Sequence, residues 1–270
     1  MPSGATRAGR TSFFLRGNVG VVGLRRCATA KSPVTLYTAR VTETARCISV
    51  VIPTLNEAAD LPETLRRIRL VLEVRDVIIA DGGSRDDTVK LAAAAGCVVV
   101  NSAPGRGRQL RAGAESATGE VVLFLHADTW VPPDAGRALL ACLARPDVVG
   151  GAFYKIFRDP PNWLVRGSRF KCWWRLVVAR RVMADQGIFL RRETLSRIGG
   201  VPDVPLMEEF ELCKRLRPLG RLALADATVV TSARKFSKLG VMRTYALMWR
   251  VTLGYYRGVP LEDLRKLYER

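Results

Sequence analysis

Residues 119–130 read Gly-Glu-Val-Val-Leu-Phe-Leu-His-Ala-Asp-Thr-Trp, and this stretch decides the fold. Its five successive apolar residues, Val121 to Leu125, form a run that is too short for an ordinary buried helix. The run is rich in branched and aromatic side chains, which predicts a strand that is buried on both faces. His126 and Asp128 follow at its C-terminal end, the place where open α/β sheets bind their ligands.

His126 and Asp128 form a candidate metal site. In an extended segment, alternation places both side chains on the same side, with the small Ala127 between them. An imidazole and a carboxylate presented in this way can bind a divalent cation, which in turn binds a diphosphate. The alternative is structural: Asp128 caps the next element, and His126 is a core histidine. We favour the metal site because His126 is the only histidine in the chain and lies beside a carboxylate at a strand terminus.

The length and charge of the chain limit its function. With 270 residues it can bury a substantial core, and its net charge of +18 favours anionic partners such as nucleotides, phospholipid surfaces or nucleic acid. The alternative is that the charge only confers solubility. The six cysteines include no C-x-x-C pair, which favours reduced core residues over a zinc site or a disulfide framework. No uninterrupted apolar stretch approaches the length of a membrane-spanning helix.

The N-terminal segment differs from the rest in composition. Residues 1–42 carry seven basic residues and no acidic one, among many serines, threonines and alanines. This composition is typical of an organellar transit peptide, and its Ser/Thr/Ala richness favours the chloroplast over the mitochondrion. We therefore predict that residues 1–45 are a disordered transit peptide, and that residues 46–270 form the folded domain. The alternative is an unstructured tail or a misassigned start codon, and N-terminal sequencing of the mature protein distinguishes these possibilities.

Strands and helices alternate along residues 46–130. The pattern predicts strands at 47–52, 77–80 and 97–100 before the strand at 121–125, with Pro53 ending the first. Helical spacing follows the first two strands, and a loop at 104–109 leads into a helix at 110–117. This alternation predicts an α/β fold with a doubly wound, mostly parallel sheet and right-handed crossovers. We expect residues 46–130 to be the nucleotide-binding half.

Residues 131–270 are expected to form the acceptor half and the C-terminal helices. The predicted elements are a helix at 134–143, a strand at 148–154 added at the sheet edge, a short strand at 186–190, a helix from Met207, and a strand pair or extended run at 222–232. Segments 162–183 and 241–256 are basic and aromatic, a composition that suits amphipathic helices lying on an anionic membrane surface. The alternative is that their aromatic side chains reach the core of the protein.

Four motifs together resemble the family 2 inverting glycosyltransferases. They are residues 48–57 (Ile-Ser-Val-Val-Ile-Pro-Thr-Leu-Asn-Glu), residues 81–88 (Asp-Gly-Gly-Ser-Arg-Asp-Asp-Thr), His126-Ala127-Asp128 and Met207-Glu208-Glu209. They occur in the right order over about residues 47–257, which makes the set more specific than any single motif. The Leu-His-Ala-Asp-Thr sequence is similar to a branch associated with radical-SAM and selenoprotein systems.

The resemblance implies a GT-A-like nucleotide-diphospho-sugar transferase fold. It also implies a UDP- or GDP-sugar donor, a divalent Mg²⁺ or Mn²⁺ ion, and a single displacement that inverts the anomeric centre. The acceptor would be a hydroxyl or a phosphate, and the two basic aromatic segments suggest an anionic membrane surface and a lipid-linked acceptor.

The donor would lie on residues at the ends of the first strands. Glu57 and Asp81 can accept hydrogen bonds from ribose hydroxyls and the base, with helix capping as the alternative, which fits Asp81 less well because two glycines follow it. Arg106 and Arg108 match phosphate oxygens, although they can equally be solvated loop charges. The full set of donor-side candidates is Pro53, Thr54, Glu57, Asp81, Arg106, Arg108, Gln109, Ala127 and Asp128.

The acceptor oxygen needs a general base, because an alcohol is a poor nucleophile while it keeps its proton. In the family pattern the position of Glu208-Glu209 reads Glu-Asp and the second carboxylate is the base, so the resemblance implies Glu209, with Glu208 beside it. Two departures stand out: Glu209 is one methylene longer than the usual Asp, and His126 replaces the first acid of the common Asp-x-Asp. Gln186 and Arg234 are candidates for the acceptor or phosphate side.

Two other function classes fit the sequence less well. A nucleotidyltransferase would usually carry a Gly-rich signature with a basic residue just after the first strand, and residues 54–57 offer none. A nucleic-acid-binding protein would fit the charge, but no recognised module is present and the basic residues are spread along the chain. We therefore expect no nucleic-acid partner.

Overall fold

The computed structural model describes residues 47–160, 162–163, 165–166 and 169–269. The predicted transit peptide lies outside the described residues, so the leader and the organellar location inferred from it stay predictions.

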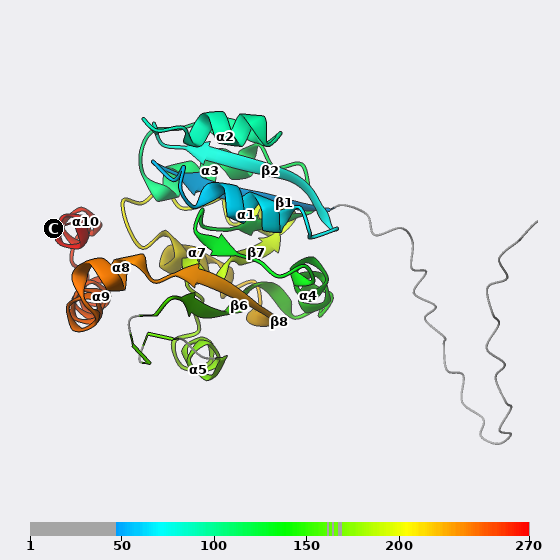
Figure 1. Cartoon of the computed structure of the whole chain (residues 1–270). Helices are drawn as coiled ribbons and strands as arrows, with labels where there is room; N and C mark the ends of the chain where they lie inside the picture. Colours follow the sequence, from blue (N-terminus) through cyan, green and yellow to red (C-terminus); the bar gives the residue numbers. More distant parts are fainter. Residues whose placement is uncertain (1–46, 161, 164, 167–168, 270) are drawn as a thin grey trace, which may run out of the picture. The chain divides into compact units, whose positions relative to one another are not determined.

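Within the described residues the strands form one sheet in the order β3-β2-β1-β4-β7-β6-β8-β5 (Figure 1). Strands β1 to β4 are parallel, β7 runs antiparallel to β4 and β6, and β8 is parallel to β6. The predicted α/β fold with a mostly parallel sheet is therefore confirmed. The bounds are β1 (Ile48–Thr54), β2 (Val74–Asp81), β3 (Val98–Asn101), β4 (Val121–Phe124), β5 (Thr129–Trp130), β6 (Val148–Arg158), β7 (Ile188–Arg191) and β8 (Arg221–Ser232).

Strand β4, Val121–Phe124, lies in the middle of this sheet. β4 is buried along its whole length, as predicted, with β1 on one side and β7 on the other. Gly119 precedes it in close contact with β1: a Cβ there would lie 2.5 Å from the carbonyl oxygen of Cys47. The N–H of Gly119 also donates to the Ser49 hydroxyl at 2.8 Å, which fixes the start of β4 against β1.

The prediction that the strand at 148–154 lies at the sheet edge is wrong. β6 lies between β7 and β8, and the edge strands of the described sheet are β3 and β5. The reason is the length of β8, a single twelve-residue strand that pairs with β6 from Val148 to Arg158. Hydrophobic pattern shows that a segment is extended but does not show which strand it pairs with.

Pro53 does not end β1, which continues to Thr54. Proline is tolerated here because of the sheet geometry. The carbonyl of Val51 accepts a hydrogen bond from the N–H of Leu125, so the backbone groups of Val51 point toward β4. The backbone of Pro53, two residues further along the strand, points to the same side. β4 has ended at Phe124, so the N–H that Pro53 lacks has no partner strand to bond.

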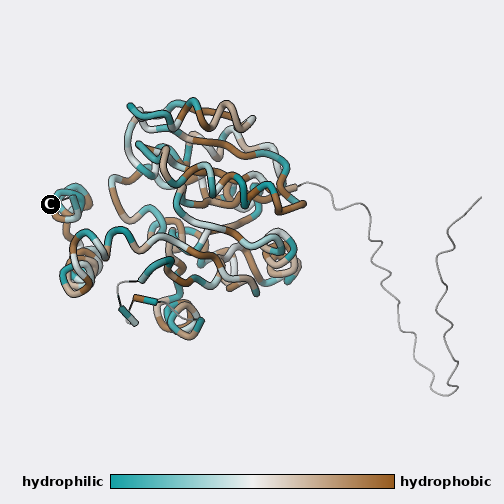
Figure 2. The backbone as a smooth tube through the Cα atoms, in the orientation of Figure 1, coloured by the Kyte–Doolittle hydropathy of each residue, from teal (hydrophilic) through white to brown (hydrophobic). Residues whose placement is uncertain are grey.

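Helices cover both faces of the sheet. Side chains of α1, α2 and α4 join one core cluster with Ile48, Val50 and Ile52, and side chains of α3, α6 and α7 join the other with Val51 and Val122. The strands are mostly hydrophobic in Figure 2, whereas the helices alternate along their length. The helices are α1 (Leu61–Ile68), α2 (Thr88–Ala94), α3 (Arg106–Glu115), α4 (Ala135–Leu143), α5 (Arg169–Ala179), α6 (Arg192–Arg197), α7 (Glu208–Leu216), α8 (Arg234–Leu239), α9 (Val241–Tyr256) and α10 (Leu261–Glu269), with the 3₁₀ turn η1 (Ala184–Gln186).

The two basic aromatic segments present most of their described aromatic side chains to solvent, whereas Tyr255 packs against Phe210. α9 has the predicted bounds, whereas α5 is shorter than segment 162–183, part of which lies outside the described residues. Trp173, Trp174 and Trp249 are exposed, so the alternative that these aromatic residues reach the core does not hold for them. None of the helices in the described part of the chain is long and apolar enough to cross a bilayer.

Candidate active site

The chain turns sharply after β4. The N–H of Thr129 donates to the carbonyl of His126 at 3.1 Å, so residues 126–129 form a tight turn rather than the extended segment that was predicted. The turn arises because Thr129 must enter β5 and pair with β8. The His126 ring lies in a pocket with Glu208 and Glu209, whereas the Asp128 carboxylate lies against Arg234. The joint metal site of His126 and Asp128 therefore stays a prediction.

Asp128 belongs to a group of carboxylates around one guanidinium. Its side chain is almost buried, and Arg234 Nε lies 3.5 Å from its Oδ2. The two terminal nitrogens of Arg234 donate to the two carboxylate oxygens of Glu57 at 2.8 and 2.6 Å, and one of them is 3.4 Å from Asp60. Arg234 thus approaches three carboxylates, and its predicted place on the acceptor or phosphate side of the site stays a prediction.

The electrostatics of Asp128 favour an additional cation. Burial raises the pKa of the Asp128 carboxyl above its usual range; the charge of Arg234 opposes this effect, and Glu57 and Asp60 add to it. In the described part of the chain, no group of three or more histidine, cysteine or acidic side chains could hold a metal ion. Mg²⁺ commonly binds through one or two carboxylates, with substrate phosphates and water as the other ligands. Asp128 fits such a site, in which the donor diphosphate completes the coordination.

Asp81 has a structural role in this structure. Its Oδ2 accepts the N–H groups of Gly83 and Ser84, both at 2.8 Å, and its Oδ1 accepts the hydroxyl groups of Thr54 and Ser84. Burial alone would raise the pKa of Asp81, but these hydrogen bonds outweigh it and lower the pKa below its ordinary value. Asp81 thus stabilises the turn after β2, a role that the sequence did not predict, and its contact with a donor nucleotide stays a prediction.

The loops after β1 and β2 are joined by hydrogen bonds. Asn56, in the left-handed region at φ 57°, donates its N–H to the Ser84 hydroxyl, and its side-chain oxygen accepts the N–H of Arg85. The N–H of Glu57 donates to the Thr88 hydroxyl at 2.9 Å. These bonds connect the two motifs that were predicted to bind the donor and hold Glu57 where it can meet Arg234.

The loop predicted at 104–109 ends earlier than expected, because α3 begins at Arg106. Gly105, at φ 134°, makes the bend before the helix. Arg106 lies 3.4 Å from a carboxylate oxygen of Glu208, so it joins the pocket of the proposed base. Arg108 instead forms an exposed ion pair with Asp203 at 3.2 Å.

Two predicted site residues hold the fold together. The buried Gln109 amide donates to the carbonyls of Thr54 and Ala80 at 2.7 and 2.9 Å, which connects α3 to the ends of β1 and β2. The buried Gln186 amide donates to the carbonyl of Phe153 and accepts the N–H of Met183. These contacts are to backbone groups, so both side chains act as structural links in this structure.

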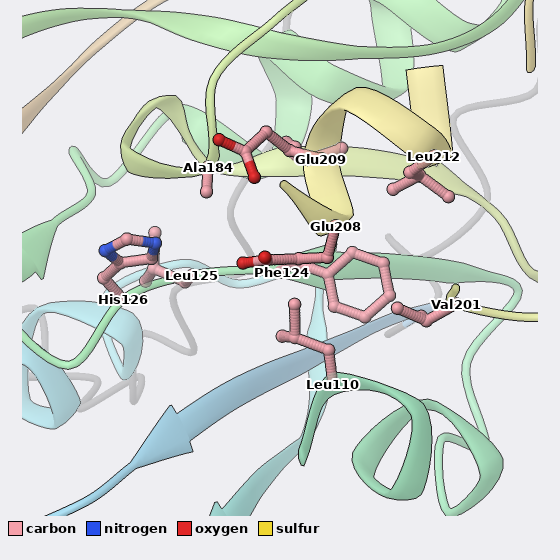
Figure 3. Close-up of a pocket in the computed structure, with 10 residues that line it drawn as sticks. Leu110, Phe124, Leu125, His126, Ala184, Val201, Glu208, Glu209 and Leu212 are labelled. Atoms are coloured by element: carbon pink, nitrogen blue, oxygen red, sulfur yellow. The ribbon is translucent and has the colours of Figure 1, made fainter. Parts of the chain in front are cut away.

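Glu208 and Glu209 are the first residues of α7, as predicted. Figure 3 shows the Glu208 carboxylate directed toward the ring of His126, and the Glu209 carboxylate beside Ala184. Oε1 of Glu208, which Nη1 of Arg106 approaches to 3.4 Å, is buried and makes no hydrogen bond within the described residues. Burial, together with the negative charge of Glu208, raises the pKa of Glu209 to about 8, while Arg106 opposes the shift. Glu209 is therefore mostly protonated at neutral pH in the unliganded protein.

His126 is a neutral imidazole in this pocket. Burial and the positive charge of Arg106 lower its pKa to about 3, while Asp185 opposes the shift. Its Nε2 is buried and has no hydrogen-bond partner among the described residues. The cavity between His126 and the two glutamates measures about 20 Å³, which is enough for one water molecule. A neutral ring with a free nitrogen can ligate a metal or bind a water.

Sequence reasoning missed three charged residues near the site: Asp60, Lys155 and Asp185. Lys155 is almost buried and pairs with Asp185, whose charge also acts on His126. One signal for Lys155 was available, because it occupies an alternate position between Phe153 and Phe157 on a strand, where an inward lysine needs a partner. Asp60 and Asp185 gave no such signal.

Comparison with known proteins places this chain in a family. The sequence profile of glycosyl transferase family 2 matches residues 49–193. The chain is 37% identical over 160 residues to an undecaprenyl-phosphate 4-deoxy-4-formamido-L-arabinose transferase of Pseudomonas aeruginosa, an alignment that covers 53% of this chain and 46% of the relative. The corresponding transferase of Sodalis glossinidius is 31% identical over 168 residues, which cover 53% and 48% of the two chains. The chain thus spans about half the length of these relatives.

Solved structures share the fold. Glucosyl-3-phosphoglycerate synthase of Mycobacterium tuberculosis, determined with Mn²⁺, UDP and glucosyl-3-phosphoglycerate, aligns with a TM-score of 0.56 at 24% identity, over 80% of this chain and 81% of that one. A mannosyltransferase of Pyrobaculum calidifontis, determined with GDP-mannose and Mn²⁺, aligns with a TM-score of 0.56 at 24% identity, over 76% and 59%. The protein therefore has a GT-A-like fold. The chain belongs to glycosyl transferase family 2.

Proposed function

We propose that this chain transfers a sugar from a UDP- or GDP-sugar to an acceptor hydroxyl or phosphate, with inversion at the anomeric carbon and with a divalent metal ion. The observation that carries the proposal is a pair of acidic side chains with raised pKa values: Asp128 in the turn after β4, and Glu209 in the pocket beside His126. Family membership favours this reaction over nucleotidyl transfer or nucleic-acid binding.

On the donor side, Asp128 would hold Mg²⁺ or Mn²⁺ together with the donor diphosphate. The bound metal supplies Lewis-acid stabilisation of the leaving diphosphate. Arg234 lies next to Asp128 and Glu57, and its planar guanidinium is suited to phosphate oxygens once a nucleotide competes for Glu57. We assign the nucleotide to the loops after β1 and β2, which form the donor half, residues 46–130.

On the acceptor side, Glu209 would take the proton from the acceptor oxygen at its own carboxylate. A base is effective when its pKa lies near the working pH, and the raised pKa of Glu209 meets this condition. Arg106, which lies 3.4 Å from Glu208, partly neutralises the acidic pair so that Glu209 can ionise. Residues 131–270 would supply the acceptor half.

The relatives support the finer parts of this proposal. The two curated relatives are named for transfer to undecaprenyl phosphate, which favours a lipid-linked acceptor here. The structural neighbours contain Mn²⁺ with UDP or GDP-mannose, which favours the same class of donor and metal. Because of the Leu-His-Ala-Asp-Thr sequence, we also propose that the chain belongs to the branch associated with radical-SAM systems.

A thermal-shift panel of UDP-, GDP- and ADP-sugars, with and without Mn²⁺, tests the donor. A ligand at about 100 times its Kd stabilises the folded state by about 2.7 kcal/mol, which corresponds to a rise in Tm of several degrees for a domain of this size. We expect this rise for a UDP- or GDP-sugar with Mn²⁺, and a much smaller one without it. A rise for duplex DNA and for none of the sugars would reject the proposal.

We further propose that the enzyme docks on anionic membranes through α5 and α9. Tryptophan favours the membrane interface, and Trp173, Trp174 and Trp249 are exposed beside basic residues. In liposome flotation without the leader, we expect binding that needs anionic lipid, weakens with salt and falls when Trp173 and Trp174 are changed to alanine. Alanine at Leu70 and Leu72, which are also exposed, is the matched control. Protein that stays unbound at low salt would rule out membrane docking.

A further inference from the structure

A groove of about 500 Å³ lies between α7 and the loop that joins α9 to α10. We call it the α7–α9 groove; its polar and aromatic lining consists mainly of Arg181, Phe210, Lys214, Arg217, Tyr255 and Tyr256. Three basic side chains and three aromatic rings in one groove suit a ligand that is anionic at one point and apolar elsewhere. Its size is within the range of small-molecule sites.

Arg181 is the residue of this groove with unused binding capacity. Its guanidinium lies 4.1 Å from the ring centre of Phe210, and its Nη1 donates to the Tyr256 hydroxyl at 2.8 Å. Its Nε is buried and has no hydrogen-bond partner, and no carboxylate in the described part of the chain forms an ion pair with it. Burial lowers the pKa of Arg181 below its usual value, the effect expected of a cation that lacks an anion.

The other charged side chains that line the groove already have partners within the protein. Arg217 donates to the carbonyls of Ala179 and Arg180, so it mainly holds the end of α5. The single acidic residue of the lining, Glu211, accepts the Tyr255 hydroxyl at 2.6 Å and lies 3.9 Å from Lys214. Arg181 and Lys214 therefore remain as the two groups best able to meet an anion.

The groove is next to the proposed base and to the exposed face of α9. Phe210 follows Glu209 on α7, and Glu209, when it is ionised, acts on Arg181. Met242, Trp249 and Tyr256 are 75%, 65% and 61% exposed. They are spaced by seven residues, so they share one face of α9, and Tyr256 at the end of that row lines the groove.

We propose that the α7–α9 groove binds the phosphate group of a phosphate-bearing acceptor, with Arg181 and Lys214 as its anion-binding residues. The assignment rests on the proposed glycosyl transfer, for which it specifies the chemical class of the acceptor. The aromatic side chains pack against the part of the acceptor next to the phosphate, and the row of residues on α9 leads from the groove to the surface.

Direct binding measurements on the protein without the leader test this assignment. The probes are farnesyl phosphate, farnesol, glycerol 3-phosphate and inorganic phosphate, each with the wild type and with Arg181→Gln, Lys214→Gln and Arg137→Gln. Arg137 is an exposed residue of α4 and is the control for the lost charge. Lys214 is largely exposed, so its variant folds even if the loss of Arg181 disturbs the stacking on Phe210. The binding of UDP and of GDP with Mn²⁺ is measured in parallel.

We expect Arg181→Gln to weaken farnesyl phosphate binding about tenfold or more, because a hydrogen bond to a charged group is lost. Lys214→Gln should weaken it several-fold, and Arg137→Gln should leave it unchanged, with UDP binding within twofold throughout.

Equal affinity for glycerol 3-phosphate would assign the groove to a soluble phosphate rather than a lipid. Equal binding of farnesol, no binding of any anion, or unchanged binding by both groove variants would overturn the assignment. Failure of the wild type to bind either UDP or GDP with Mn²⁺ would instead reject the proposed function and leave the groove result intact.

Discussion

Glu209→Gln is expected to lower kcat by about 10²- to 10⁴-fold, the usual contribution of a general base, while Mn²⁺-dependent donor binding stays close to that of the wild type. The reason is that glutamine keeps the size of the side chain and its contacts in the pocket but cannot take the acceptor proton. Single-turnover transfer with the donor found in the thermal-shift panel measures the effect. A loss below tenfold would contradict base catalysis by Glu209 and point to a phosphate oxygen, which is already largely ionised at neutral pH, as the nucleophile.

The pH dependence provides a second measurement on the same variant. Because the pKa of Glu209 is raised to about 8, wild-type kcat/KM should increase with pH up to about 8, and the residual rate of Glu209→Gln should lack this increase. Stability changes in the opposite direction. The folded state keeps the Glu209 proton after the unfolded state has lost it at about 4.5, so this group reduces stability as pH rises from about 4.5 to 8. The variant should therefore gain in Tm relative to the wild type over that range.

Local patterns made the main features of this fold predictable. β4 was predicted because its five apolar residues form a run too short for a buried helix, and α9 because the segment from Val241 to Tyr256 has the composition of an amphipathic helix. The start of α7 at Glu208 was predicted from the motif it carries. In each of these cases the sequence signal and the structure it specifies lie within about a dozen neighbouring residues.

Features that depend on distant residues were not predictable in the same way. The contact between Glu57 and Arg234 joins residues 177 positions apart, and Lys155 meets Asp185 across thirty. No short motif encodes these pairs, because they exist only after β6 has paired with β7 and β8 has paired with β6. The turn at 126–129 was missed for the same reason: Thr129 bonds to β8, and this bends a segment that looks extended in the sequence.

The same distant contacts determine how the site responds to mutation. Arg234 has Glu57 and Asp60 as partners besides Asp128, so removing one carboxylate does not leave its guanidinium unpaired. Asp128, by contrast, has Arg234 as its single basic partner in the described part of the chain. A change at Asp128 should therefore affect the donor site much more than the fold.

Asp128→Asn is expected to reduce turnover by about 10³-fold or more, because a metal ion at the leaving diphosphate contributes several kcal/mol and each 1.36 kcal/mol is tenfold in rate. Tm should stay equal or rise, since a nearly buried carboxyl with a raised pKa is replaced by a neutral group of the same shape. Titration of UDP with and without Mn²⁺ should show that the variant loses the metal-dependent part of the affinity. EDTA should inhibit the wild type to a similar degree, and His126→Ala should have a milder effect than Asp128→Asn.

The matched control for this charge is Asp147→Asn, an exposed aspartate that forms an ion pair with Arg221 at 2.9 Å on the surface. It removes the same charge far from the turn after β4, so activity should be unchanged. If the wild type is fully active in EDTA while Asp128→Asn is inactive, Asp128 acts without a metal, and its partner in the reaction is then Arg234. This outcome would reject the metal-dependent mechanism but not the assignment of Asp128 to the diphosphate, because Arg234 lies 3.5 Å from its carboxylate and would carry the positive charge that the leaving group requires.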